Sequence, residues 1–181
     1  IKDVKKFMRW MKKNAHVDYC RFLLQLLGLR RAERLGLTWD NIHGLDTSSP
    51  TIVISQQLAR YESTEYDYSL RSKDSRDLTG WYIKKWTKTK KIRKIPLQGG
   101  FVKELRAHKK IWEANKKNWE PVRQKQIKAH KEWVANKRKG DEPIVVPPIG
   151  MENLVFLKPD GNLITLNRDN EDWRMYLDLA G

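Results

Sequence analysis

The sequence has a single cysteine and no long apolar run. Cys20 cannot form an internal disulfide, and its place on the apolar face of an expected helix suits a small packed hydrophobe, so we expect a cytoplasmic protein. No stretch approaches the roughly 20 apolar residues of a membrane-spanning helix, and the charged N-terminus lacks the apolar core of a signal peptide. We expect no membrane partner. Because the first residue is Ile1, we also expect a piece of a longer protein.

Acidic residues are scarce relative to basic ones. The 22 aspartates and glutamates are outnumbered by 37 lysines and arginines, which leaves a formal net charge of +15 on 181 residues. A charge of this size favours a polyanionic partner. The hydrophobic content of 39%, with eight tryptophans, is enough for a packed core and excludes a disordered basic tail.

The most informative segment follows an apolar helix. Apolar residues recur at helical spacing over 17–27, which predicts a helix with one buried face. Gly28 suits the left-handed position that closes many helices, so Arg30 is expected at the rim of the core. If a further helical turn follows, Glu33 lies within reach of Arg30 or Arg31 and can fix the guanidinium. A surface ion pair of negligible energy explains this segment alone equally well.

The rest of the pattern predicts an α+β fold, mostly helical, with a small antiparallel three-stranded sheet. We expect one domain over 1–181, made of helices at 1–45, a sheet at 51–97, basic helices at 101–139, and a strand and last helix at 154–181. The expected strands are 51–55, 81–87 and 93–97, the last two joined by a lysine-rich turn, and a short strand 154–156. Pro121 is expected to start a second basic helix. The last helix is expected to carry Trp173, Tyr176, Leu177 and Ala180 on one face.

The lysine-rich turn carries five basic residues and no acid: Lys88, Lys90, Lys91, Arg93 and Lys94. Their mutual repulsion is costly unless an anion binds. A lysine at the tip of a hairpin can approach a phosphate as a mobile point charge and proton donor. The same run also suits a solvated turn whose charges prevent edge-to-edge pairing.

Three motifs occur in one order along the chain. They are Gly28-Leu29-Arg30-x-x-Glu33 with Leu37-x-Trp39, then Lys88-x-x-Lys91-x-Arg93-x-Ile95-Pro96-Leu97, then Leu154-Val155-Phe156. In this order and spacing the sequence resembles the tyrosine recombinase (phage integrase) family. The resemblance covers nearly the whole chain and corresponds to about the first two thirds of that family's catalytic domain.

The resemblance implies a bacterial or phage-encoded protein that breaks and rejoins double-stranded DNA through a 3′-phosphotyrosyl intermediate, with no metal or other cofactor. By position, Arg30 is the first catalytic arginine, which clamps the nonbridging phosphate oxygens, and Lys88 is the general acid for the leaving 5′-oxygen. Glu33 then supports Arg30. The resemblance implies that four further residues contact the DNA backbone: Arg31, Lys90, Lys91 and Arg93.

The family's His-x-x-Arg pair and tyrosine nucleophile are lacking. None of the four histidines has an arginine three positions later, and Tyr176 lies upstream of where that pair belongs. We therefore expect this chain to be unable to cleave DNA by itself. We also expect a monomer off DNA, and a multimeric synaptic complex for the full-length protein.

Two other interpretations remain open. A truncated integrase acting as a regulator, or a non-catalytic basic DNA-binding protein, fits the same composition, and in the latter Trp112, Trp119 and Trp133 would stack on bases. We favour packing for these tryptophans because apolar residues share their faces. A metal-dependent nuclease needs clustered carboxylates. Its candidates, Asp169, Glu171 and Asp172, crowd a helix start where the helix dipole already favours acids.

Overall fold

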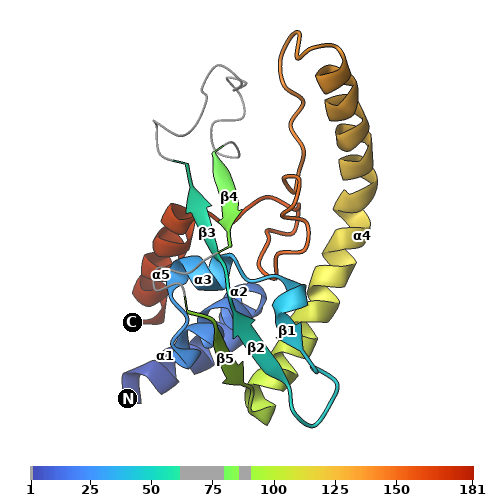
Figure 1. Ribbon diagram of the computed structural model, residues 1–181. Helices are drawn as coiled ribbons and strands as arrows, with labels where there is room; N and C mark the ends of the chain where they lie inside the picture. Colours follow the sequence, from blue (N-terminus) through green and yellow to red (C-terminus); the bar gives the residue numbers. More distant parts are fainter. Residues whose placement is uncertain (1, 62–79, 86–90) are drawn as a thin grey trace.

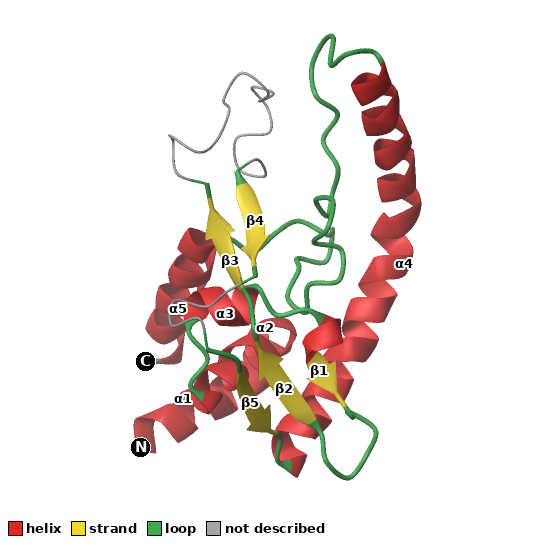
Figure 2. Ribbon diagram, in the orientation of Figure 1, coloured by secondary structure: helices red, strands yellow, loops and turns green. Residues whose placement is uncertain are grey.

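The computed structural model describes residues 2–61, 80–85 and 91–181. Its helices lie behind and to both sides of two small antiparallel sheets (Figures 1 and 2). The helices are α1 (Lys2–Asn14), α2 (His16–Leu23), α3 (Arg31–Leu35), α4 (Gly99–Ala135) and α5 (Leu166–Ala180), with 3₁₀ turns η1 (Leu24–Leu27) and η2 (Trp39–Asn41). The strands are β1 (Ile42–His43), β2 (Thr51–Ile54), β3 (Gln57–Arg60), β4 (Trp81–Lys84) and β5 (Arg93–Pro96). The predicted α+β class, with helices predominating, is confirmed.

The strand pairing differs from the prediction. A three-stranded antiparallel sheet has the order β1-β2-β5, with Ile52 opposite Ile95, whereas β3 and β4 form a separate two-stranded sheet. The predicted hairpin between 81–87 and 93–97 is therefore wrong within the described residues, because each of its strands pairs with a different partner. Buried Ile52 and Ile54 determine this arrangement, since their shared face must cover the core.

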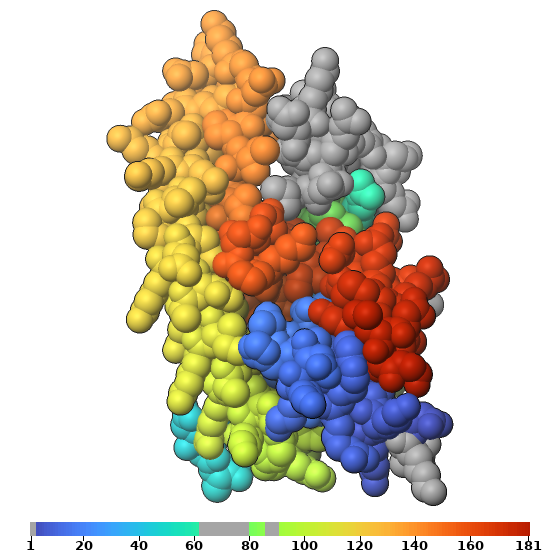
Figure 3. Space-filling model, turned by 180° about the vertical axis from the view of Figure 1, so that it is seen from behind, coloured from blue at the N-terminus to red at the C-terminus, as the bar shows by residue number. Residues whose placement is uncertain are grey.

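The interior contains two apolar clusters. The larger lies between the three-stranded sheet and α4, and its most buried members are Leu24, Ile52, Leu105 and Val155. The smaller joins α1 and α2 to α5 through Phe7, Met8, Met11 and Phe22, with Trp173 and Tyr176 packed on it. Phe7 and Trp173 meet edge to face with ring centroids 5.0 Å apart. The first and last helices therefore lie side by side (Figure 3).

Helix α4 is one continuous helix, so the predicted start of a second helix at Pro121 is wrong. The proline lacks the N–H that would bond the carbonyl of Lys117. Both residues are exposed, so water can satisfy that carbonyl. Contacts on the opposite side of the helix keep it continuous past the missing bond, as described below.

Two smaller expectations also change. Segment 154–156 is no strand: Leu154 makes an isolated bridge with Thr38, and Val155 N donates to the carbonyl of Leu37 at 2.8 Å. Leu177 is 44% exposed and lies off the buried face of α5.

None of the helices in the described ranges combines the length and hydropathy that a membrane span requires.

Candidate functional site

The local structure around Gly28 places Arg30. Helix α2 continues into η1, and Gly28 closes this turn in the left-handed conformation, with φ of 75°. Leu29 is then buried, which anchors the chain in the core. Arg30 is extended and forms the N-cap of α3, with its side chain 52% exposed. The predicted position at the core rim is confirmed by this geometry.

Glu33 connects Arg30 to the three-stranded sheet. Its carboxylate is 1% exposed, and Oε2 accepts a hydrogen bond from the Arg30 backbone N–H at 2.9 Å. The Arg30 guanidinium lies 3.7 Å from Oε1, and Arg93 of β5 donates to Oε2. Three residues singled out from the sequence thus meet, although 60 positions separate Glu33 from Arg93. One buried carboxylate holds two half-exposed guanidinium groups.

Beside Arg30 the surface is hollowed into a cavity of about 300 Å³ lined by three arginines, Arg30, Arg31 and Arg34, with Asp169 and Trp173 among the other residues. Arg31 is half-exposed, and its Nε lies 3.6 Å from Asp169 Oδ2. Arg34 is buried and donates to the same oxygen at 2.6 Å. Burial lowers the pKa of Arg34 despite the attraction of Asp169. Asp169 is the one acidic residue in this lining and also pairs with Arg21, while Glu33 behind Arg30 is shared with Arg93, so the cavity wall carries excess positive charge and suits an anion.

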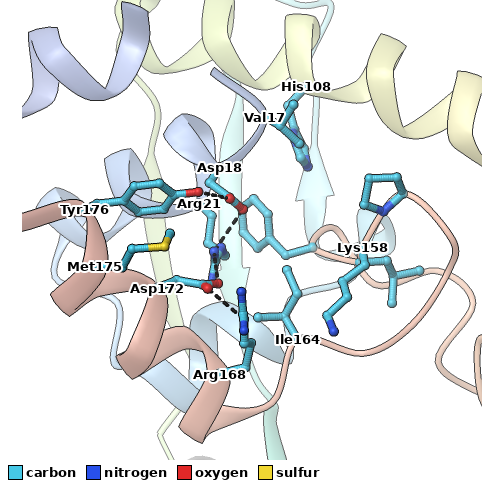
Figure 4. Close-up of a pocket in the computed structure, with 13 residues that line it drawn as sticks. Val17, Asp18, Arg21, His108, Lys158, Ile164, Arg168, Asp172, Met175 and Tyr176 are labelled. Atoms are coloured by element: carbon cyan, nitrogen blue, oxygen red, sulfur yellow. Dashed lines mark hydrogen bonds and ion pairs between the residues drawn. The ribbon is translucent and has the colours of Figure 1, made fainter. Parts of the chain in front are cut away.

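A buried ion network that the sequence did not reveal supports this wall. Figure 4 shows the part of it around Arg21, where Asp18, Asp172 and Arg168 meet beside a neighbouring pocket. Arg21, 1% exposed, donates to Asp169 at 2.5 Å, to Asp172 at 2.8 Å and to Asp18 at 2.9 Å. Burial alone would lower the pKa of Arg21, but these three carboxylates together raise it. Asp172 also accepts from Arg168 at 2.8 Å. The network joins α2, α3 and α5.

The interpretation of the α5 carboxylates as acids at a helix start is therefore incomplete, because Asp169 and Asp172 are buried partners of arginines. One sequence signal was available. Both Asp18 with Arg21 and Asp169 with Asp172 stand three residues apart, which places each pair on one helix face. Nothing in the sequence said that these two faces meet.

Tyr176 lies at the edge of the network, half-buried on α5. Its hydroxyl donates to Asp18 Oδ2 at 2.6 Å. Burial and this hydrogen bond raise the pKa of Tyr176, so the phenol stays protonated. A protonated, hydrogen-bonded phenol agrees with its expected place in the core.

The lysine-rich turn is only partly placed. Lys88 and Lys90 lie outside the described residues, while Lys91 is exposed just before β5.

The three tryptophans of α4 all contact other parts of the protein. Trp119 is buried, Trp112 Nε1 donates to the Leu154 carbonyl at 2.9 Å, and Trp133 Nε1 donates to the Gly140 carbonyl at 3.1 Å. Packing contacts therefore account for them. Within residues 2–61, 80–85 and 91–181, no group of three or more His, Cys, Asp or Glu side chains is placed to hold a metal ion.

The sequence matches no protein-family model and none of the curated proteins with which it was compared. Solved structures of the Tn1549 transposon integrase do match. One, in complex with a circular intermediate DNA, has a TM-score of 0.55 at 19% identity, covering 96% of this chain and 41% of that chain. Another, with transposon right end DNA, has a TM-score of 0.51 at 20% identity, covering 92% and 39%.

The chain has an integrase fold. It spans about two fifths of the length of the Tn1549 integrase chains that it matches. At this level of identity the similarity shows the fold alone. Arg30, Glu33 and Arg93 are therefore assigned no role by the integrase match itself, and their contacts with one another come from the present structure.

Proposed function

We propose that this chain is the DNA-binding part of a site-specific tyrosine recombinase. The observation that carries the proposal is the contact of the buried Glu33 carboxylate with both Arg30 and Arg93, beside an arginine-lined cavity. A guanidinium held in this way presents paired donors to nonbridging phosphate oxygens without losing further side-chain entropy on binding. The integrase fold, and its occurrence in structures with DNA, supports the choice of DNA as the polyanion.

In the proposed reaction a tyrosine attacks the scissile phosphate, forms the 3′-phosphotyrosyl link and releases a 5′-hydroxyl. Arg30 stabilises the charge that develops on the nonbridging oxygens. Lys88 gives a proton to the leaving 5′-oxygen. Arg31, Lys90, Lys91 and Arg93 contact the backbone on either side. The nucleophile is not among the residues of this chain, so the chain by itself binds DNA without cleaving it.

The sharpest test changes the charge of Glu33. Replacing Glu33→Gln removes one negative charge, which by simple electrostatics would tighten DNA binding. If Glu33 positions the two arginines, the variant instead binds a DNA duplex more weakly than the wild type, by about 3-fold to 10-fold, because the guanidinium groups lose their common anchor. Fluorescence anisotropy with a labelled duplex measures this change.

The matched control is Glu171→Gln, an identical charge change at a side chain that is 67% exposed. It should leave binding unchanged or slightly tighter. Tighter DNA binding by Glu33→Gln, equal to that of the control, would contradict the positioning role.

Replacing Arg30→Ala should weaken DNA binding and lower the slope of log K against log salt by the amount expected for about one phosphate contact. Unchanged binding of that variant would favour a protein that merely coats DNA, and a covalent DNA adduct formed by this chain would contradict the missing nucleophile.

A further inference from the structure

A basic arm projects from the fold. It consists of residues 116–150, that is, the outer part of α4 and the segment that returns beside it, and it extends beyond α1, α2 and α5 (Figures 1 and 3). The arm carries nine basic side chains and four acidic ones, of which Asp141 and Glu142 lie in the returning segment. Arg123 is already paired with Glu152 at 3.0 Å. The remaining cations repel one another, which a polyanion would relieve.

The return segment occupies one side of the helix. Three hydrogen bonds along the helix hold it there: Arg123 Nε donates to the Pro147 carbonyl at 2.9 Å, Val146 N donates to Gln126 Oε1 at 2.9 Å, and Trp133 Nε1 donates to the Gly140 carbonyl at 3.1 Å. Glu142 adds an oxygen 3.3 Å from His130 Nε2 on the same side. The arm is therefore a built element in which the opposite side of α4 faces solvent.

That opposite side is the lysine face: Lys110, Lys117, Lys125, Lys128 and Lys131. All five are exposed, and none forms an ion pair with another described residue. At 3.6 residues per turn, Lys110, Lys117 and Lys128 fall within about 20° of one another around the axis and span about 27 Å along it. Unlike these, Lys109 and Lys116 lie over the rings of Trp39 and Trp112.

The acids near the lysine face leave it strongly positive. Glu104 pairs with Lys12 at 2.5 Å, and Glu120 accepts from Gln124. Only Glu113 and Glu132 remain beside the five lysines. The tip adds three consecutive cations, Lys137 to Lys139. Its backbone is held by bonds from Lys137 N to the Val134 carbonyl and from Arg138 N to the Trp133 carbonyl, at 3.1 and 2.9 Å.

We propose that the lysine face binds the phosphate backbone of a duplex DNA segment outside the phosphate held at Arg30. Duplex DNA carries one charge per about 1.7 Å of axis, so a row of mobile point charges about 27 Å long faces phosphates along its whole length. Trp119 is buried and Trp133 Nε1 donates to the Gly140 carbonyl of the return segment, so neither ring lies on the lysine face for unpaired bases to stack on. A duplex backbone therefore fits better than a single strand. This inference deepens the proposed function, on which the choice of DNA depends.

The test compares two triple variants of the 181-residue chain. The arm variant is Lys117→Gln, Lys125→Gln and Lys128→Gln. Its control is Lys5→Gln, Arg9→Gln and Lys13→Gln on α1, which removes the same charge from equally exposed positions. With a labelled duplex of about 30 base pairs, the arm variant should lower the slope of log K against log salt by up to about 2.7 and weaken binding at least about 10-fold. The control should change the slope of log K against log salt by less than the value for one phosphate contact, about 0.9.

Each outcome separates the two proposals. If the wild type binds no duplex, the proposed function fails and the inference fails with it. If Arg30→Ala weakens binding but the arm variant matches its control, only the inference fails. If the arm variant binds duplex like the wild type but loses binding to poly-glutamate, the arm binds an acidic protein and the DNA assignment is overturned. Far-UV circular dichroism verifies that both triple variants are folded.

Discussion

Replacing Asp169→Asn should destabilise the protein far more than a typical surface substitution. The Asp169 side chain is 2% exposed, and its two oxygens accept from Arg21 at 2.5 Å and from Arg34 at 2.6 Å. Both guanidinium groups are equally buried. Asparagine keeps the size of the side chain but leaves two buried cations with less compensating charge.

The magnitude follows from the burial. Removing one partner of a buried ion pair typically costs about 3–5 kcal/mol, because the remaining charge stays in a medium of low polarity. Asp172 and Asp18 still contact Arg21, so we place the loss near the lower limit, at about 3 kcal/mol. A domain of this size has about 5–15 kcal/mol of stability, so the variant should still fold.

Urea unfolding, followed by tryptophan fluorescence, measures the effect as a shift of the midpoint. Glu171→Gln on the same helix is the control, and it should cost less than about 1 kcal/mol because its ion pair is exposed. Equal losses in the two variants would refute the reasoning. The double variant Arg34→Leu with Asp169→Leu should lose less than the sum of its single variants, because the two side chains interact directly.

Three further predictions concern stability and reactivity. Burial lowers the pKa of His108 below its ordinary value of 6.5, so on acidification the unfolded state binds a proton before the folded state does. The free energy of unfolding should therefore fall as the pH drops below about 6.5. In urea titrations at several pH values, His108→Gln should lose part of this pH dependence. Gly36→Ala should destabilise by more than about 3 kcal/mol, because its Cβ would overlap the backbone of Leu58, whereas Gly100→Ala meets open space and should not destabilise. Burial raises the pKa of Cys20, so a thiol reagent should label it only at the rate of unfolding, and rapid labelling of the native protein would contradict the packing.

Much of the candidate site could be predicted because its signals are local. The left-handed turn at Gly28, the exposed Arg30 beyond it and the reach of Glu33 back to Arg30 all depend on residues within a few positions of one another. Helical periodicity likewise identified the buried face of the segment 17–27, on which Cys20 and Leu24 are buried.

The main errors involve contacts between distant segments. Pro121 ends a helix by its local preference, yet the return segment, held through Arg123, keeps α4 continuous. Likewise, β4 and β5 each have strand-forming sequences, but the choice of partner depends on which faces cover the core. The carboxylate of Asp169 looked like a helix-start acid because Arg21 lies 148 positions away in the sequence.

The sequence by itself determined most of the helical segments, the strands β2, β4 and β5, the excess of positive charge and the Arg30–Glu33 unit, because backbone preferences and spacing act over one or two turns. Only the tertiary structure decided that Arg93 shares the Glu33 carboxylate, that Asp169 neutralises buried arginines, and that five lysines of α4 remain without acidic partners. The physical reason is the same in each case. The strength of a charge interaction depends on distance and burial, and these exist only once the chain has folded.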